Sequence, residues 1–169
     1  MMRKNEEPPV ASPDRVGQTT AVETALPNPG VAEAVAAYFA AINKGDRDLW
    51  LDVFAEGSAV HDPIGAPPVE GQAALVELWN GIVGPFETLR VEPASLHFGG
   101  TGAAAAWQAS GKGVNGRHVA FEGITVFEIS DEGKIQALMA YWDPAAMIME
   151  LAGDEPTDRS GQQDGEVPV

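Results

Sequence analysis

An aspartate at the end of a short apolar stretch is the residue best placed to do chemistry in this sequence. Asp62 ends an expected strand over residues 58–62 and precedes a turn over 63–68 that holds three prolines and a glycine. Because a proline restricts the preceding residue to an extended backbone, Pro63 fixes the direction in which the Asp62 carboxylate points. A carboxylate held in this way can act as a general base, whereas an aspartate before proline can also simply start a turn. These residues alone leave both interpretations open.

A tyrosine on the apolar face of an expected helix is the second candidate. Val31, Val35, Tyr38 and Ile42 recur at helical spacing. A buried phenol needs a hydrogen-bond partner, and this face otherwise offers only valine and isoleucine. The Tyr38 hydroxyl could therefore serve in either of two roles. It could donate a hydrogen bond to a ligand oxygen, or it could be a core group that bonds to the backbone.

Other residue types argue against metal, nucleophile and nucleotide chemistry. The chain has no cysteine, and His61, His97 and His118 lack the spacing of metal ligands. Its serines lie outside a nucleophile-elbow pattern, and its glycine runs lack the lysine of a phosphate-binding loop. The sequence therefore predicts neither a metal site nor a cofactor.

The charge balance restricts the partners. Among 169 residues, Lys and Arg number 10 against 25 Asp and Glu, for a net charge of −15. This charge repels the phosphates of nucleic acids and anionic lipid surfaces. No stretch approaches the roughly 20 apolar residues of a membrane helix. We therefore expect a small apolar ligand, no nucleic acid or membrane partner, and a cytoplasmic location.

The hydrophobic pattern predicts one α+β domain over residues 30–151. Its first half has helical spacing over 31–42, 49–54 and 72–82. Its second half predicts strands at 89–91, 103–110, 119–129 and 134–142, separated by Gly-rich turns. Helices followed by a run of strands predict a curved antiparallel sheet with three N-terminal helices that enclose a pocket. Residues 1–29 and 152–169 have no such period, so we expect disordered tails there.

Residues 62–71, which read DPIGAPPVEG, resemble a known segment. They are similar to the Asp-Pro-(apolar)-Gly-x-Pro-Pro-(apolar)-x-Gly segment of ketosteroid isomerases, within the wider SnoaL/NTF2-like superfamily. Tyr38 followed by Gly45-Asp46, the stretch 131–135, and Ala140-Tyr141-Trp142 agree as well. The resemblance covers roughly residues 30–149 and implies an NTF2-like cone.

The resemblance also implies a function. It is that of a cofactor-independent isomerase that moves a double bond into conjugation with a ketone of a steroid-like substrate. Asp62 matches the general base, and Tyr38 matches the tyrosine that donates a hydrogen bond to the enolate oxygen. The substrate-binding positions carried over are Phe54, Trp79, Thr125, Leu138 and Trp142.

Thr125 departs from the family, because it stands where the family has a second, acidic donor. A threonine hydroxyl is the weaker donor, and the loss of one oxyanion donor typically costs on the order of 100- to 1,000-fold in turnover. Glu122 has the opposite strand parity and should face away from the pocket. We expect Asp62, Tyr38 and Thr125 to line one pocket, with Asp62 and the Tyr38 hydroxyl on opposite sides of a ligand-sized gap.

Two other functions fit the same segment. Relatives that act in polyketide tailoring, as epoxide hydrolases or cyclases, use a second carboxylate, for which Glu87 and Glu92 are the nearest candidates in sequence. A non-catalytic small-molecule-binding module is also consistent, because a fold does not fix a function. The resemblance further implies a homodimer.

Overall fold

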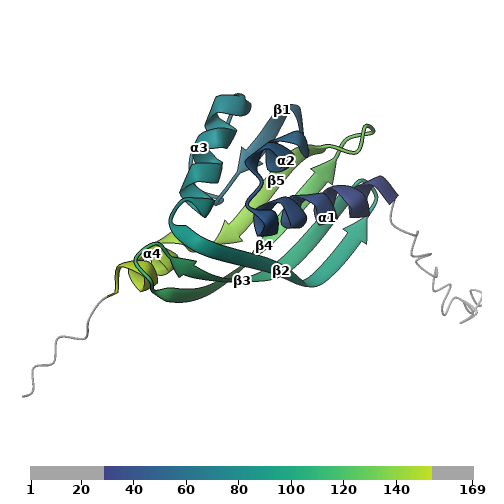
Figure 1. Cartoon of the computed structure of the whole chain (residues 1–169). Coiled ribbons are helices and arrows are strands. Elements are labelled where there is room, and N and C mark those ends of the chain that lie inside the picture. Colours follow the sequence, from purple (N-terminus) through teal and green to yellow (C-terminus); the bar gives the residue numbers. More distant parts are fainter. Residues whose placement is uncertain (1–28, 154–169) are drawn as a thin grey trace, which may run out of the picture.

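The computed structural model describes residues 29–153, which form helices on a five-stranded sheet (Figure 1). The helices are α1 (Pro29–Lys44), α2 (Arg47–Asp52), α3 (Gly71–Val83) and α4 (Pro144–Ala152). The strands are β1 (Phe54–His61), β2 (Phe86–Gly99), β3 (Gly102–Gly113), β4 (His118–Ile129) and β5 (Ile135–Trp142). The expected tails lie outside the described residues, with three exceptions: Pro29 begins α1, Ala152 ends α4, and Gly153 caps α4.

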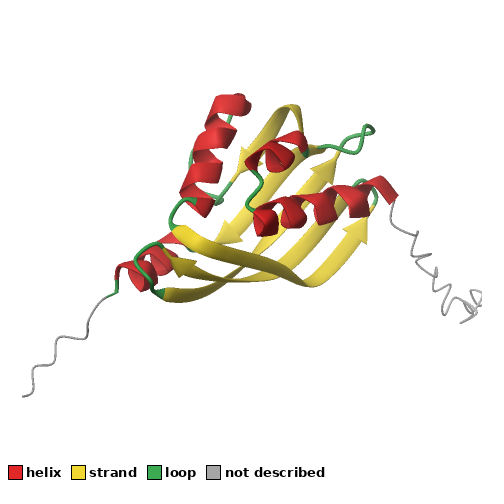
Figure 2. Ribbon diagram, viewed as in Figure 1, coloured by secondary structure: helices red, strands yellow, loops and turns green. Residues whose placement is uncertain are grey.

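The sheet is curved and mixed, with the strand order β1-β5-β4-β3-β2 (Figure 2). Strands β2 to β5 form an antiparallel meander, as expected. One edge of the sheet has a pairing that the sequence did not indicate, because β1 pairs with β5 in parallel. Parallel neighbours require a long crossover, and here α3 and three strands of the meander separate β1 from β5.

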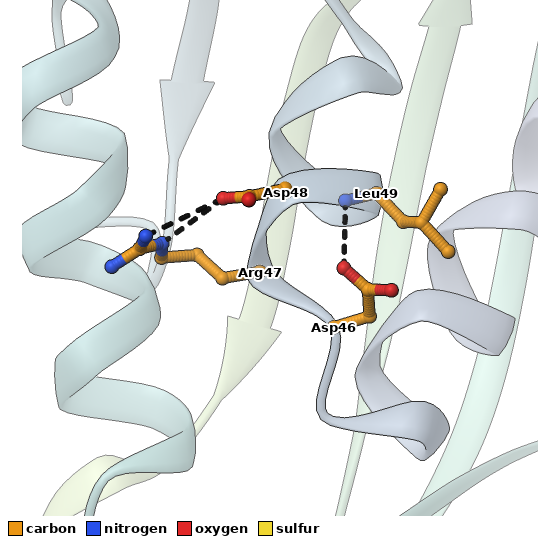
Figure 3. A network of polar contacts seen from close by, with 4 residues as sticks. All are labelled: Asp46, Arg47, Asp48 and Leu49. Carbon is orange, nitrogen blue, oxygen red and sulfur yellow. Dashed lines mark hydrogen bonds and ion pairs between the residues drawn. The ribbon is translucent and has the colours of Figure 1, made fainter.

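The three N-terminal helices cover one face of the sheet (Figures 1 and 2). In α1 the predicted stripe is buried and faces the sheet. Gly45, with φ 66°, ends this helix region, and the Asp46 carboxylate caps α2 by accepting the Leu49 backbone N–H at 3.1 Å (Figure 3). Beside this cap, Arg47 and Asp48 form an exposed ion pair. None of the described helices is long and apolar enough to cross a membrane.

Two strand boundaries differ from the sequence expectation. Phe54 begins β1 and pairs with Ile135 instead of ending a helix. An apolar residue in the last turn of a short helix and one at the start of a buried strand give the same spacing, so periodicity could not separate them. Strand β2 starts at Phe86 and ends at Gly99, far beyond residues 89–91. It is an exposed edge strand that tolerates Pro93 beside a bulge, so its alternation is weak.

Helix α4 was not expected. It begins where the Asp143 carboxylate accepts the backbone N–H groups of Ala145 and Ala146, and Pro144 occupies its first turn. Met147 on its buried face packs with Phe86 and Val119. This helix therefore covers one end of the sheet (Figure 1), and its position decides the shape of the candidate site.

Candidate functional site

Asp62 lies directly after β1, and the chain on both sides of it is fixed. The Val69 backbone N–H donates to the Val60 carbonyl at 2.8 Å, and the Ile64 N–H donates to the Ala140 carbonyl at 2.7 Å. The Asp62–Pro63 peptide bond is cis. The carboxyl group is 9% exposed and accepts the Trp142 indole N–H at 2.6 Å. A buried carboxyl with one defined donor is thus held at the end of the β1–β5 pair.

Tyr38 is buried in α1 among aromatic rings. Its ring centroid lies 5.2 Å from that of Phe127, 6.1 Å from that of Trp50 and 6.3 Å from that of Phe54. The Trp50 indole N–H is buried without a hydrogen-bond partner of ordinary geometry among the described residues. It still acts on the Tyr38 hydroxyl, because it lowers the pKa of that group. The ring is therefore locked, and no described acceptor takes the Tyr38 hydroxyl proton.

Thr125 faces the helices from the middle of β4. It is 2% exposed, and its hydroxyl oxygen accepts the Trp107 indole N–H at 2.9 Å. Glu122 is exposed on the other face of the strand, as its parity predicted. The inward position of Thr125 therefore follows from strand alternation.

The structure brings Tyr38, Asp62 and Thr125 to one cavity. The same cavity is lined by Trp107, Phe121, Trp142 and, from α4, Met147. Its volume is about 30 Å³, which is room for about two water molecules and far below the roughly 300–1,000 Å³ of a small-molecule site. The expected ligand-sized gap is therefore not open, because the aromatic rings and Met147 fill it. A larger ligand requires these side chains to move.

The other carried-over positions divide into two groups. Trp142 lines the cavity with Thr125, whereas Phe54, Trp79 and Leu138 lie outside its lining. Phe54 and Trp79 pack against Trp50, with ring centroids 4.7 and 5.4 Å away, and Leu138 is a buried core residue of β5. These three residues belong to the core beside the cavity. A role in substrate binding stays a prediction for all five carried-over positions.

Sequence reasoning missed Met147, because it missed the helix. The signal was present in Asp143-Pro144, a cap followed by a proline suited to a first turn. Trp107 and Phe121 are aromatic residues of two inward-facing strand positions, a pattern that fits a core residue and a pocket wall equally. No local signal indicated that the Trp107 indole reaches Thr125.

Burial sets the protonation of the two titratable groups in the cavity. It raises the pKa of Asp62 above its usual range, and the hydrogen bond from Trp142 partly offsets that rise. Burial also raises the pKa of Tyr38, and the negative charge of Asp62 raises it further, so the phenol stays a donor. The arrangement can thus remove a proton at Asp62 and donate hydrogen bonds from hydroxyl groups.

Neither sequence candidate for a second pocket carboxylate lies in the cavity. Glu87 and Glu92 are exposed on the edge strand β2 and pair with Lys112 and Arg90. Among the residues that the structure describes, Asp62 is the only carboxylate in the cavity lining. Within residues 29–153, no group of three or more His, Asp or Glu side chains could hold a metal ion.

Comparisons with known proteins assign this chain to a family. Residues 35–155 match the SnoaL-like domain. The chain is 28% identical over 122 residues to a steroid delta-isomerase of Nocardioides simplex, which covers 70% of this chain and 94% of that protein.

Solved structures agree with this assignment. SalBIII, an epoxide hydrolase/cyclase-like enzyme of pyran ring formation in the polyether salinomycin, is 32% identical, with a TM-score of 0.61 over 67% of this chain and 90% of that one. A Δ5-3-ketosteroid isomerase of Mycobacterium sp. is 28% identical, with a TM-score of 0.61 over 68% and 93% of the two chains. The α+β architecture with its curved open sheet is that of NTF2-like folds. The protein belongs to the SnoaL-like domain family.

Proposed function

We propose that this protein is a cofactor-independent isomerase that moves a carbon–carbon double bond into conjugation with a ketone, on a steroid-like substrate. One observation carries the proposal: a buried carboxyl residue and two hydroxyl residues, whose hydroxyl protons have no acceptor among residues 29–153, line the same apolar cavity. The similarity to two steroid isomerases supports it.

Each polar group has one part in the reaction. Asp62 removes a proton from the carbon between the ketone and the double bond, and the electron pair moves onto the ketone oxygen as an enolate. Tyr38 and Thr125 donate hydrogen bonds to that oxygen. The protonated Asp62 then returns the proton to the far carbon of the former double bond, so no atom is gained or lost. The raised pKa of Asp62 makes its carboxylate a stronger base than an exposed aspartate.

A β,γ-unsaturated 3-keto steroid tests this function, because the conjugated product gains ultraviolet absorption. Asp62→Asn should abolish turnover while the conjugated product still binds. Tyr38→Phe should lower kcat by on the order of 100-fold, as expected for one oxyanion donor. Thr125→Asp should raise kcat, since burial keeps the new carboxyl protonated. A wild type that binds the steroid without isomerising it would establish a non-catalytic binding module instead.

The second candidate function is that of an epoxide hydrolase or cyclase, and the 32% identity to SalBIII favours it. This chemistry would need a group besides Asp62 to open or attack the epoxide. Glu87 and Glu92 lie outside the cavity, so the hydroxyls of Tyr38 and Thr125 would have to act as the acids. Ring opening of an epoxide that requires Asp62, with no isomerisation of the unsaturated ketone, would establish this candidate.

We also propose that two copies of the chain pair through the sheet face opposite the helices. Outward side chains of β3, β4 and β5 form two apolar rows on that face, listed by register as Ala106–Ile124–Tyr141 and Ala104–Val126–Met139. Ile124 and Tyr141 are 48% and 49% exposed, and such an apolar patch suits a self-complementary contact. Light scattering should report a dimer for the wild type and a monomer for Ile124→Glu; a monomeric wild type contradicts the pairing.

A cytoplasmic location also stays a prediction, and cell fractionation tests it.

A further inference from the structure

The Trp107–Thr125 hydrogen bond leaves the Thr125 hydroxyl proton without an acceptor in the part of the chain that the structure describes. A threonine hydroxyl has one proton to donate and two lone pairs that accept. Its oxygen accepts the Trp107 indole N–H at 2.9 Å, so the proton must point away from the indole. Within residues 29–153, no side chain or backbone oxygen takes that proton. Because Thr125 is 2% exposed and lines the cavity, the remaining direction for the proton is toward a ligand.

The sheet is built to bring this indole to Thr125. Trp107 of β3 pairs in register with Gly123 of β4, two residues before Thr125. A Cβ atom at Gly123 would lie 2.5 Å from Cζ2 of Trp107, so only a glycine allows the ring to lie across β4. Phe121 and Trp142 then hold the ring from its sides, with centroids 6.0 and 6.4 Å away. The indole orientation is therefore fixed by packing.

The indole also strengthens the hydroxyl as a donor. A hydroxyl oxygen that accepts a hydrogen bond becomes more polarised and donates more strongly, above all in a buried environment. Tyr38 lines the same cavity. A ligand oxygen between the two would receive two hydrogen bonds, although Thr125 lacks the strength of an acid.

We infer that Trp107 is a positioning residue, which turns the Thr125 hydroxyl into the cavity as a second donor to a ligand oxygen beside Tyr38. The inference rests on the proposed function for its role in the reaction, but the pairing and the donation can be measured without turnover. It deepens that function by naming the group that offsets the missing acid.

The first test follows the pair without a ligand. The chain has four tryptophans, and Trp107→Phe identifies which indole N–H resonance belongs to Trp107. Thr125→Val removes the acceptor, so this resonance should shift and its hydrogen exchange should accelerate by about 3- to 10-fold, as for one lost hydrogen bond. Thr125→Ser keeps the hydroxyl and should leave the resonance close to its original position. A Trp107 resonance that Thr125→Val does not move overturns the inference.

The second test compares two ligands of similar shape, 2-naphthol with an oxygen and naphthalene without one. Thr125→Val should weaken naphthol binding by about 10-fold or more, and Trp107→Phe by about 3- to 10-fold. Neither variant should change naphthalene affinity by more than about 2-fold. In the Thr125→Val background, Trp107→Phe should have no further effect on naphthol beyond about 2-fold, because Trp107 acts through Thr125.

Three results of the ligand comparison also overturn the inference. The wild type could bind naphthol no more tightly than naphthalene, so that no hydroxyl serves the oxygen. Trp107→Phe could weaken both ligands alike, which would make its role one of packing. Its effect on naphthol could persist without the Thr125 hydroxyl. The isomerase function fails separately, if the wild type shows the expected binding pattern yet does not convert the unsaturated ketone.

Discussion

Replacing Trp142 with phenylalanine tests how the protein controls its candidate base. The indole N–H donates to the Asp62 carboxyl at 2.6 Å, a short bond to a buried group. Such a bond stabilises the ionised form, and it lowers the pKa of Asp62 against the larger effect of burial. The phenylalanine keeps an aromatic ring against Trp107 and Phe121 but removes the donor. The pKa of Asp62 should therefore rise in Trp142→Phe, so that at a given acidic pH a smaller fraction of Asp62 is ionised than in the wild type.

The size of the effect follows from the bond. A hydrogen bond to a charged group contributes about 1.5–3 kcal/mol, and about 1.4 kcal/mol corresponds to a factor of ten. Water or a rearranged neighbour can replace part of the bond, so we take the lower end of this range. On the acid side, where the rate follows the ionised fraction of Asp62, Trp142→Phe should lower kcat/KM by about 10-fold relative to its own plateau.

The assay is the pH profile of kcat/KM for the unsaturated ketone. The acid limb should move to higher pH in Trp142→Phe, because a base with a raised pKa is ionised only at higher pH. Trp107→Phe is the matched control: it also removes an indole N–H, but one that donates to Thr125, so its acid limb should stay in place. A carbon NMR titration of the Asp62 side chain reports the same change without substrate. An acid limb that Trp142→Phe leaves unmoved, or moves to lower pH, refutes the reasoning.

Further predictions concern stability and access. Since burial raises the pKa of Asp62 in the folded state, the stability of the protein should fall as pH rises from the pKa of the unfolded state to that of the folded state. Asp62→Asn removes this titration. The Tm of Asp62→Asn should therefore exceed that of the wild type by a margin that grows as pH rises between those two pKa values. Met147→Ala should lower stability by about 2 kcal/mol in a denaturant titration and enlarge the cavity, so that naphthalene binds more tightly; unchanged affinity would mean that Met147 does not limit the volume. Asp46→Ala should cost about 1 kcal/mol through loss of the α2 cap, whereas Asp48→Ala, which removes only an exposed ion pair, should leave the Tm nearly unchanged; equal effects would contradict the capping role.

The family resemblance named Asp62, Tyr38 and Thr125, and local sequence patterns predicted how their segments place them. Helical spacing placed Tyr38 on the buried face of α1, and strand alternation placed Thr125 inward and Glu122 outward. The turn after Asp62 followed from its prolines and glycine. These features depend on the backbone period and on restricted dihedral angles, which residues close in sequence set by themselves.

The cavity walls could not be predicted with the same success. Phe54, Trp79 and Leu138 are buried as their apolar character requires, yet they lie behind the lining. Whether a side chain is buried follows largely from its apolar character. Whether a buried side chain lies in the core or in the wall of a cavity depends on the distances between helices and strands. Those distances are not encoded in any one segment.

The sequence by itself determined the α+β class, the three N-terminal helices, the antiparallel meander, and the inward direction of Tyr38 and Thr125. Tertiary structure alone decided that β1 runs parallel to β5, which brings Asp62 to the Trp142 indole. It also decided that Trp107 reaches Thr125 across Gly123, and that Met147 of α4 lines the cavity of about 30 Å³. The physical reason is range. Periodicity and capping act over a few residues, whereas the Trp107–Thr125 and Trp142–Asp62 hydrogen bonds join residues that are 18 and 80 positions apart, which only strand register and packing bring together.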